Sequence, residues 1–140
     1  MLRTRLRTLE AMCALVMAHV LIHGLPFSIG VRLAGRLGDG DQDGIDRTPD
    51  DPGVRAVASA IRRGAWRLPF ASTCLKRAVA GRLMLLRRGT ASSLVIGVAM
   101  RDGRPSAHAW LVAGGGVVCG GTEAAEFSPI VAWHSRAQRL

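Results

Sequence analysis

Cys74 and His108 are the side chains of this sequence whose types and surroundings best suit chemistry. Ser72 and Thr73 stand just before Cys74, and either residue can cap the N-terminus of a helix that begins there. The N–H groups and the dipole of a first helical turn favour an anion, and therefore the thiolate form of a cysteine. His108 lies in a segment with the pattern of a strand, on the same face as Trp110. This arrangement predicts a cysteine nucleophile with its general base.

A structural role is the alternative interpretation of Cys74. Cysteine is among the residue types most often buried, so a cysteine on a core helix commonly serves packing alone. The chain has two further cysteines, Cys13 and Cys119. Three cysteines are too few, and an odd number cannot all pair, for a secreted disulfide scaffold. The set therefore favours a reduced, cytoplasmic compartment.

Periodicity and turn residues predict the elements that must position Cys74 and His108. The predicted helices span residues 52–66 and 74–88, and the predicted strands span residues 93–100, 107–113 and 117–119. Asp102 and Gly103 predict the turn between the first two strands, and three consecutive glycines predict the next hairpin loop. The tail that follows has an irregular, partly helical pattern. Helices followed by a small antiparallel sheet indicate an α+β fold.

The helix predicted over residues 74–88 is expected to be amphipathic. Apolar side chains at helical spacing form its expected buried stripe, namely Leu75, Ala78, Val79, Leu83 and Leu86. The charged side chains of this helix are expected in water, namely Lys76, Arg77, Arg87 and Arg88.

Residues 1–38 form a hydrophobic, arginine-rich segment. Apolar side chains recur there at helical spacing, namely Leu9, Met12, Cys13, Val16, Met17 and Val20, and Gly24 and Pro26 end the pattern. The apolar stretch over residues 11–22 is shorter than the roughly 20 residues that a membrane-spanning helix needs. We therefore expect a helix that docks on the rest of the fold. A helix that lies on a membrane surface, beside the basic start of the chain, is the alternative.

Residues 39–53 contain six aspartates and predict an acidic linker before a domain over residues 54–140. The run D-G-D-Q-D-G at residues 39–44 matches the start of a calcium-binding EF-hand loop. Asp46 and Pro49 do not fit the rest of that pattern, so a solvated linker is expected. No spacing typical of a zinc site or of a phosphate-binding loop occurs, and we expect neither a metal nor a cofactor.

The net charge of +9 results from 19 basic and 10 acidic residues, and every basic residue except Lys76 is arginine. Such a surplus indicates an anionic partner, although a genome rich in G and C would also favour arginine over lysine. The chain has three Phe, three Trp and no Tyr, which is too few aromatic residues for a platform that stacks single-stranded bases. Nucleic acid is therefore not an expected partner.

The amino-acid sequence around Cys74 and His108 resembles that of a known family. Residues 69–98 read P-F-A-S-T-C-L-K-R-A-V-A-G-R-L-M-L-L-R-R-G-T-A-S-S-L-V-I-G-V, and H-A-W follows at residues 108–110. The C-L helix start, the R-R-G helix end, the L-x-I-G-V strand and the H-A-W motif are similar to those of the lasso-peptide leader peptidases. These are small bacterial members of the transglutaminase-like cysteine peptidase superfamily. The resemblance covers roughly residues 54–130.

This resemblance implies a papain-like or transglutaminase-like α+β core in which the helix of Cys74 packs on a small antiparallel sheet. It also implies a thiol protease that removes the leader from a ribosomally made lasso-peptide precursor. The implied partners are that precursor, a small leader-binding delivery protein and an ATP-dependent, asparagine-synthetase-like cyclase. The implied location is cytoplasmic, with peripheral membrane contact through residues 1–38 as an addition. A non-catalytic, peptide-binding member of the same complex and a membrane-surface adaptor are the alternative functions.

The family motif implies Cys74 as the nucleophile and His108 as the base. The family carries an acidic residue about a dozen positions after the histidine, and Gly120 occupies that position in this chain. Glu123 is the expected substitute, reaching back toward the imidazole. A backbone carbonyl or Asp102 remains an open alternative for the group that orients His108.

Overall fold

The computed structural model describes residues 1–24, 36–38, 47–69 and 73–135. Its helices are α1 (Leu2–Gly24), α3 (Pro52–Arg67), α4 (Cys74–Arg87) and the short α5 (Gly121–Ala124). Its strands are β1 (Arg36–Gly38), β2 (Ser93–Arg101), β3 (Arg104–Ala113), β4 (Gly116–Cys119) and β5 (Ser128–His134). The predicted helices and the three predicted strands are therefore confirmed, with small differences at their ends.

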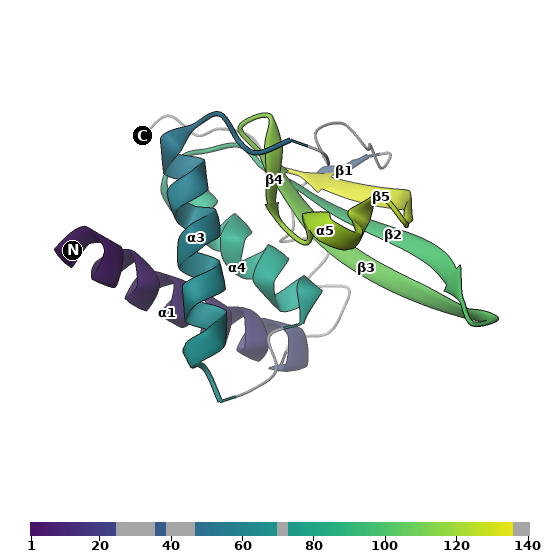
Figure 1. The fold of residues 1–140 in the computed structure, drawn as a ribbon, viewed down its shortest axis with the longest axis horizontal. Coiled ribbons are helices and arrows are strands. Elements are labelled where there is room, and N and C mark those ends of the chain that lie inside the picture. The colour runs from purple at the N-terminus through teal and green to yellow at the C-terminus, as the bar shows by residue number, and fades with distance from the viewer. Residues whose placement is uncertain (25–35, 39–46, 70–72, 136–140) are drawn as a thin grey trace.

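One antiparallel sheet holds all five strands, in the order β1-β5-β2-β3-β4. The three long helices gather on one side of this sheet, and the β2–β3 hairpin extends away from them (Figure 1). The α+β layout predicted from the order of elements is confirmed. The expectation of an irregular, partly helical tail is wrong in part: α5 is helical, but residues 128–134 form β5, which pairs with β2 in the middle of the sheet. That pairing is non-local, so the sequence near Pro129 carries little sign of it.

The β2–β3 hairpin turns through the two residues that the sequence marks for it. Arg101 pairs with Arg104, and Asp102 and Gly103 between them both have positive φ, at 51° and 74°. A two-residue turn of this type follows the right-handed twist of the strands and favours an Asp-Gly pair. The hairpin therefore fixes the register that places His108 opposite Gly97.

The main core lies between the sheet and the helices, with α4 packed against both α1 and β3. The stripe expected on α4 is wrong in part, because Leu86 is exposed whereas Lys76 and Arg82 are buried. The physical reason is that α4 is covered on two sides, so most of its circumference lies inside the protein. Arg82 compensates only in part for its burial, by donating from Nη1 to the carbonyl oxygen of Trp133 over 2.7 Å.

α1 docks on α3 and α4, as expected, but through a different face from the expected one. Small side chains make its buried face, namely Thr8, Ala11 and Ala18, together with Leu15. These side chains let the helices approach closely, and polar contacts add to the docking: Arg63 donates to Thr8, and Arg88 pairs with Glu10 over 2.7 Å. Four of the large apolar side chains that defined the expected face are exposed instead, namely Leu9, Val16, Met17 and Val20. α1 shares one core with α3 and α4, while the domain boundaries at residues 38 and 53 stay predictions.

The length of α1 corrects the expectation that this segment is too short to span a membrane. The helix has 23 residues, and by length and composition alone it could cross a bilayer. Core helices and signal sequences share both properties, so length and composition do not decide its location.

The end of the predicted linker runs beside the β3–β4 hairpin. The N–H of Val117 donates to the carbonyl oxygen of Arg47 over 3.0 Å, and the N–H of Asp50 donates to that of Gly114 over 3.0 Å. Asp51 then caps α3 by accepting from the N–H of Gly53 over 2.7 Å. The run at residues 39–44 that matches an EF-hand loop lies outside the described residues.

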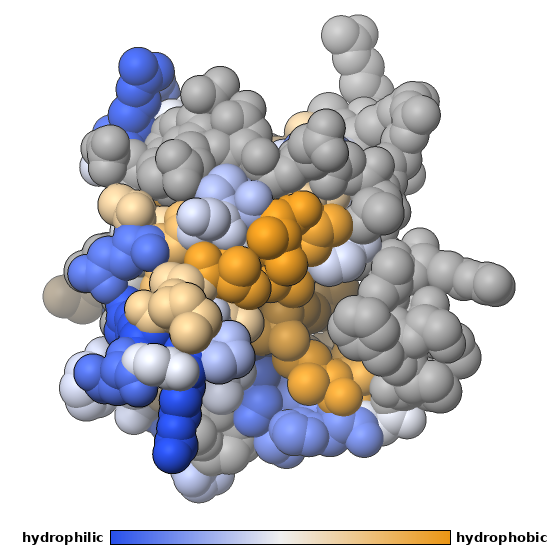
Figure 2. All heavy atoms as spheres, turned by 90° about the vertical axis from the view of Figure 1, so that its right-hand side faces the viewer, coloured by the Kyte–Doolittle hydropathy of each residue, from blue (hydrophilic) through white to orange (hydrophobic). Residues whose placement is uncertain are grey.

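The sheet face that turns away from the helices carries a second, smaller apolar cluster. Its buried members are Val95, Trp110, Ala124, Phe127 and Ala132. Viewed from the end of the molecule that bears the β2–β3 hairpin, a band of apolar side chains also reaches the surface (Figure 2). The large exposed apolar residues of β2 and β5 are Val98, Met100 and Ile130.

Candidate active site

Cys74 is the first residue of α4, where the sequence predicts it. Thr73 is the N-cap, with extended backbone geometry, and its hydroxyl oxygen accepts from the N–H of Lys76 over 3.4 Å. This cap satisfies the third N–H of the helix, while the N–H groups of the two residues before it belong to the set that a helix cannot pair internally. The partly exposed thiol of Cys74 therefore stands beside backbone donors that favour negative charge.

His108 lies on β3, on the same side of the strand as Trp110, and is largely buried. Its ring stacks on Phe127, with 5.1 Å between the ring centroids, and on Trp110, with 6.0 Å. Its Nε2 atom lies 2.7 Å from the carbonyl oxygen of Gly120. Because a carbonyl oxygen can only accept, Nε2 carries the proton, and the lone pair of the neutral ring sits on Nδ1. The hydrogen bond to Gly120 thus selects one of the two tautomers of the neutral ring.

Gly120 has a backbone geometry that no other residue adopts without strain. Its φ is +81°, and an added Cβ would lie 2.6 Å from the carbonyl oxygen of Ala109 and 3.0 Å from the Cβ of Trp110. An acidic side chain at this position, as in the family motif, would meet the same two atoms. The backbone of Gly120 therefore provides an acceptor to His108 at a position where a side chain would be strained and would clash.

One cavity of about 750 Å³ is lined by both Cys74 and His108. The two residues approach it from different sides of the sheet: α4 packs with Leu111 and Val118 in the main core, whereas His108 stacks in the second cluster. β4 ends at Cys119, and the cavity lining continues through the residues after this end. The same cavity thus reaches both the start of α4 and the imidazole, while the predicted contact between the Cys74 thiol and His108 stays a prediction.

Cys119 also lines this cavity, but it is a poor candidate for the nucleophile. Burial raises the pKa of the Cys119 thiol to about 12. At neutral pH this thiol therefore stays protonated, and the protonated form is not the reactive one. The third cysteine, Cys13, is exposed on α1 and does not line the cavity. Of the three thiols, Cys74 alone combines the cavity with a capped helix start.

The carbonyl oxygen of Gly120 contacts the imidazole, and a backbone carbonyl is one of the alternatives that the sequence leaves open for orienting His108. The side chain of Glu123 lies outside the described part of the structure, so its predicted role stays a prediction. Asp102 sits at the hairpin tip, beyond the pair Arg101–Arg104, whereas His108 pairs with Gly97 further along the same ladder. Asp102 is therefore too far along the strand to reach the imidazole. The backbone carbonyl alternative is the one that the geometry favours.

Sequence reasoning missed two further features of the site. Phe127 packs on the imidazole from the segment before β5, which the sequence reads as an irregular tail. Four arginines line the cavity, namely Arg55, Arg62, Arg77 and Arg101, and they come from α3, α4 and β2. The spacing of Arg55 and Arg62 could have indicated a shared face of α3, because residues seven apart lie two turns apart on one side of a helix.

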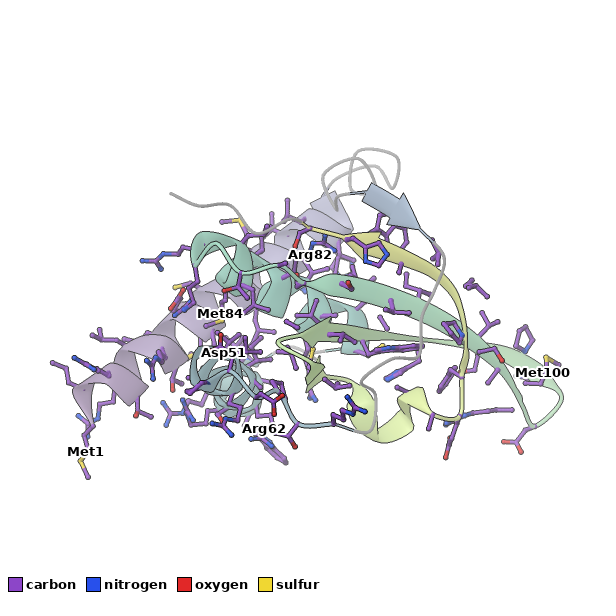
Figure 3. All side chains as sticks on the ribbon, turned by 90° about the horizontal axis from the view of Figure 1, so that it is seen from above. Met1, Asp51, Arg62, Arg82, Met84 and Met100 are labelled. Atoms are coloured by element: carbon purple, nitrogen blue, oxygen red, sulfur yellow. The ribbon has the colours of Figure 1, made fainter. Side chains whose placement is uncertain are left out.

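Arg82 is a buried cation, but it does not belong to this site. It lies on a different side of the molecule from Arg62 (Figure 3) and bonds to β5. Burial lowers the pKa of its guanidinium to about 10. Within the described ranges, no group of three or more His, Cys, Asp or Glu side chains is arranged to hold a metal ion.

Comparison with known proteins gives one significant match. The family model of the transglutaminase-like superfamily matches residues 12–132, which include α3, α4, α5, the strands β1 to β4, and parts of α1 and β5. Neither the curated proteins nor the solved structures contain a significant match to the chain.

Proposed function

We propose that this chain, which belongs to the transglutaminase-like superfamily, is a cysteine peptidase that removes the leader from a lasso-peptide precursor. The superfamily includes cysteine peptidases, which supports the class of reaction. The finer assignment rests on the sequence motifs around Cys74 and His108. The observation that carries the proposal is one cavity lined both by a thiol at a capped helix start and by an imidazole whose Nε2 atom is bonded to the carbonyl oxygen of Gly120.

The proposed reaction begins with transfer of the Cys74 thiol proton to Nδ1 of His108. The sulfur attacks the carbonyl carbon of the scissile bond, and N–H groups at the start of α4 stabilise the resulting oxyanion. Nδ1 then returns its proton to the departing amine as the C–N bond breaks, which leaves a thioester on Cys74. A water molecule then gives a proton to Nδ1 and attacks the thioester carbon. The C–S bond breaks, which releases the leader acid, and Nδ1 returns the proton to the sulfur of Cys74.

The carbonyl oxygen of Gly120 takes the part that an acidic side chain has in the family motif. It accepts from Nε2 throughout the cycle, so the ring keeps its orientation in both the neutral and the protonated state. A neutral acceptor stabilises an imidazolium less than a carboxylate would, since charge-assisted hydrogen bonds are about twice as strong. We therefore expect a competent but slow enzyme, consistent with a role in which a partner presents the substrate.

The proposed partners follow from the proposed reaction. A small delivery protein captures the leader and brings the scissile bond to the cavity, and an ATP-dependent cyclase consumes the new N-terminal amine. These partners define the assay, because cleavage is to be measured with precursor and delivery protein present.

The direct test is cleavage by Cys74→Ala, with Cys13→Ala as the matched control. Both variants remove one sulfur atom, but Cys13 is exposed on α1 and lies outside the cavity. We expect cleavage to be abolished by the first substitution and unchanged by the second. Undiminished cleavage by Cys74→Ala would contradict the proposal.

A non-catalytic, peptide-binding member is the second candidate function, and the glycine at position 120 is the observation that favours it. The two functions differ in thiol reactivity. A catalytic Cys74 reacts with iodoacetamide at pH 6–7 faster than Cys119, whose thiol is protonated there. Peptide mapping of the modified cysteines separates the two cases, because a purely structural Cys74 would react as slowly as Cys119.

We also propose that α1 holds the enzyme to an anionic membrane surface. A stripe of large apolar side chains, each at least 43% exposed, runs along its outer face: Leu2, Leu6, Leu9, Val16, Met17 and Val20. Arg3, Arg5 and Arg7 lie near the N-terminal end of α1, while Glu10, the one acidic residue of α1, pairs with Arg88 at the C-terminal end of α4. An apolar stripe with a basic end matches a surface of anionic lipid.

Sedimentation with vesicles tests this location. The protein is expected to pellet with phosphatidylcholine vesicles that contain phosphatidylglycerol, and less with phosphatidylcholine alone. The double variant Val16→Gln, Val20→Gln should lose this binding, and Arg62→Gln, a change on α3, should not. Equal pelleting of all three proteins, or a dimer that the double variant dissociates, would contradict a lipid partner.

A further inference from the structure

The cavity that joins Cys74 to His108 has a strongly one-sided charge. Four of its lining residues are arginines, and no aspartate or glutamate side chain is among the described residues that line it. Arg101 is neutralised in part, because it pairs with Glu126 and lies over the ring of Phe127. The other three have no acidic partner within the described residues, and Arg62 makes only a long contact of 3.4 Å to the hydroxyl of Ser59.

The three remaining arginines line the cavity from two helices. Arg55 and Arg62 lie two turns apart on one side of α3, and Arg77 lies one turn after Cys74 on α4. All three residues are exposed and line the cavity, so their charge acts on a solute that enters it. A guanidinium pairs with a carboxylate through two parallel hydrogen bonds and stays charged at every physiological pH.

We infer that this cavity binds carboxylates of the substrate, so that the enzyme prefers a polypeptide with acidic residues beside the scissile bond. The inference rests on the proposed function only in taking Cys74 as the reacting group. A carboxylate can come from acidic side chains or from a free C-terminus. The geometry favours side chains, since Arg55, Arg62 and Arg77 are spread over two helices and can engage several carboxylates along a chain.

The charge preference can be measured without knowing the substrate, by comparing two small alkylating agents. Iodoacetate is an anion and iodoacetamide is neutral, while both add to a thiol in the same way. At a separation on the order of 10 Å in water, one unit charge changes the local concentration of an anion about twofold. The ratio of the iodoacetate rate to the iodoacetamide rate at Cys74 should therefore exceed the same ratio at Cys13, which is exposed on α1.

Variants on α3 locate the source of this preference. The double variant Arg55→Gln, Arg62→Gln should lower the ratio at Cys74 about fourfold at low salt and leave the ratio at Cys13 unchanged. Arg67→Gln, on the same helix but outside the cavity lining, is the matched control and should change neither ratio. High salt should reduce the preference in the wild type, because it shortens the screening length.

Peptides distinguish the two sources of carboxylate. A glutamate-rich peptide with a blocked C-terminus should protect Cys74 from iodoacetamide, whereas a glutamine-rich peptide with a free C-terminus should protect little. Protection by the second peptide alone would overturn the preference for side chains. Equal ratios at Cys74 and Cys13 would overturn the inference as a whole. The same result is expected if the aspartates before Arg47 in the sequence neutralise the arginines of the cavity, so that case also counts against the inference. Neither result bears on whether Cys74→Ala abolishes cleavage.

Discussion

Replacing Gly120 by alanine adds one methyl group at the residue whose carbonyl oxygen holds His108. The φ of +81° costs a non-glycine residue about 1–2 kcal/mol. The new Cβ would also lie 2.6 Å from the carbonyl oxygen of Ala109, and overpacking of this kind costs about 1–3 kcal/mol. The free energy of unfolding should therefore fall by about 2–5 kcal/mol. The backbone shift that relieves the contact also moves the acceptor away from Nε2.

Gly103→Ala is the matched control for this substitution. Gly103 has a similar φ of +74°, but an added Cβ would have no atom within 4 Å. Only the strain of about 1–2 kcal/mol should then apply. Urea unfolding of both variants isolates the steric contact as the difference between them. Loss of one hydrogen bond to His108 should also slow alkylation of Cys74 roughly two- to tenfold in Gly120→Ala alone. Equal stability and equal reactivity of the two variants would refute the role assigned to Gly120.

Three further predictions concern stability and are each measured by urea unfolding. Asp51→Ala should lower the free energy of unfolding by about 1 kcal/mol, because it removes the cap of α3. The hydrogen bond from Arg88 lowers the pKa of the Glu10 carboxyl below 4.5. The wild type should therefore be more stable than Glu10→Gln at neutral pH, and this difference should vanish as the pH falls through the lowered pKa. A stability difference that does not change with pH would contradict the pairing. Arg82→Met should leave stability unchanged or raise it at pH 7, since the buried guanidinium, whose pKa is lowered to about 10, has two nitrogens without a partner among the described residues. A loss of more than about 1 kcal/mol in Arg82→Met would contradict this.

The sequence contains most of the local signals that build this fold. The cap at Thr73, the Asp-Gly turn at residues 102–103 and the strand that carries His108 each depend on neighbours within a few residues. The helix start of Cys74 is therefore predictable from local pattern. The same holds for the face that His108 shares with Trp110, since alternation along a strand fixes it.

The features that the sequence does not reveal depend on contacts between distant segments. β5 is a strand because β2 pairs with it, and Phe127 meets His108 only as a consequence. α1 buries the face that carries small side chains, because these let it approach α3 and α4 closely. The close packing outweighs the loss from leaving larger apolar side chains exposed on the opposite face. The carbonyl of Gly120 is not visible as a functional group in any sequence, because every residue has one.

The claim that His108 serves Cys74 is tested most directly by the rate at which iodoacetamide modifies Cys74 near neutral pH. Wild type and His108→Ala are compared in one experiment, with the exposed Cys13 of each protein as the internal reference. The account predicts that the substitution slows modification of Cys74 at least about tenfold and leaves Cys13 unchanged. Equal rates at Cys74 in the two proteins would show that the imidazole does not act on this thiol.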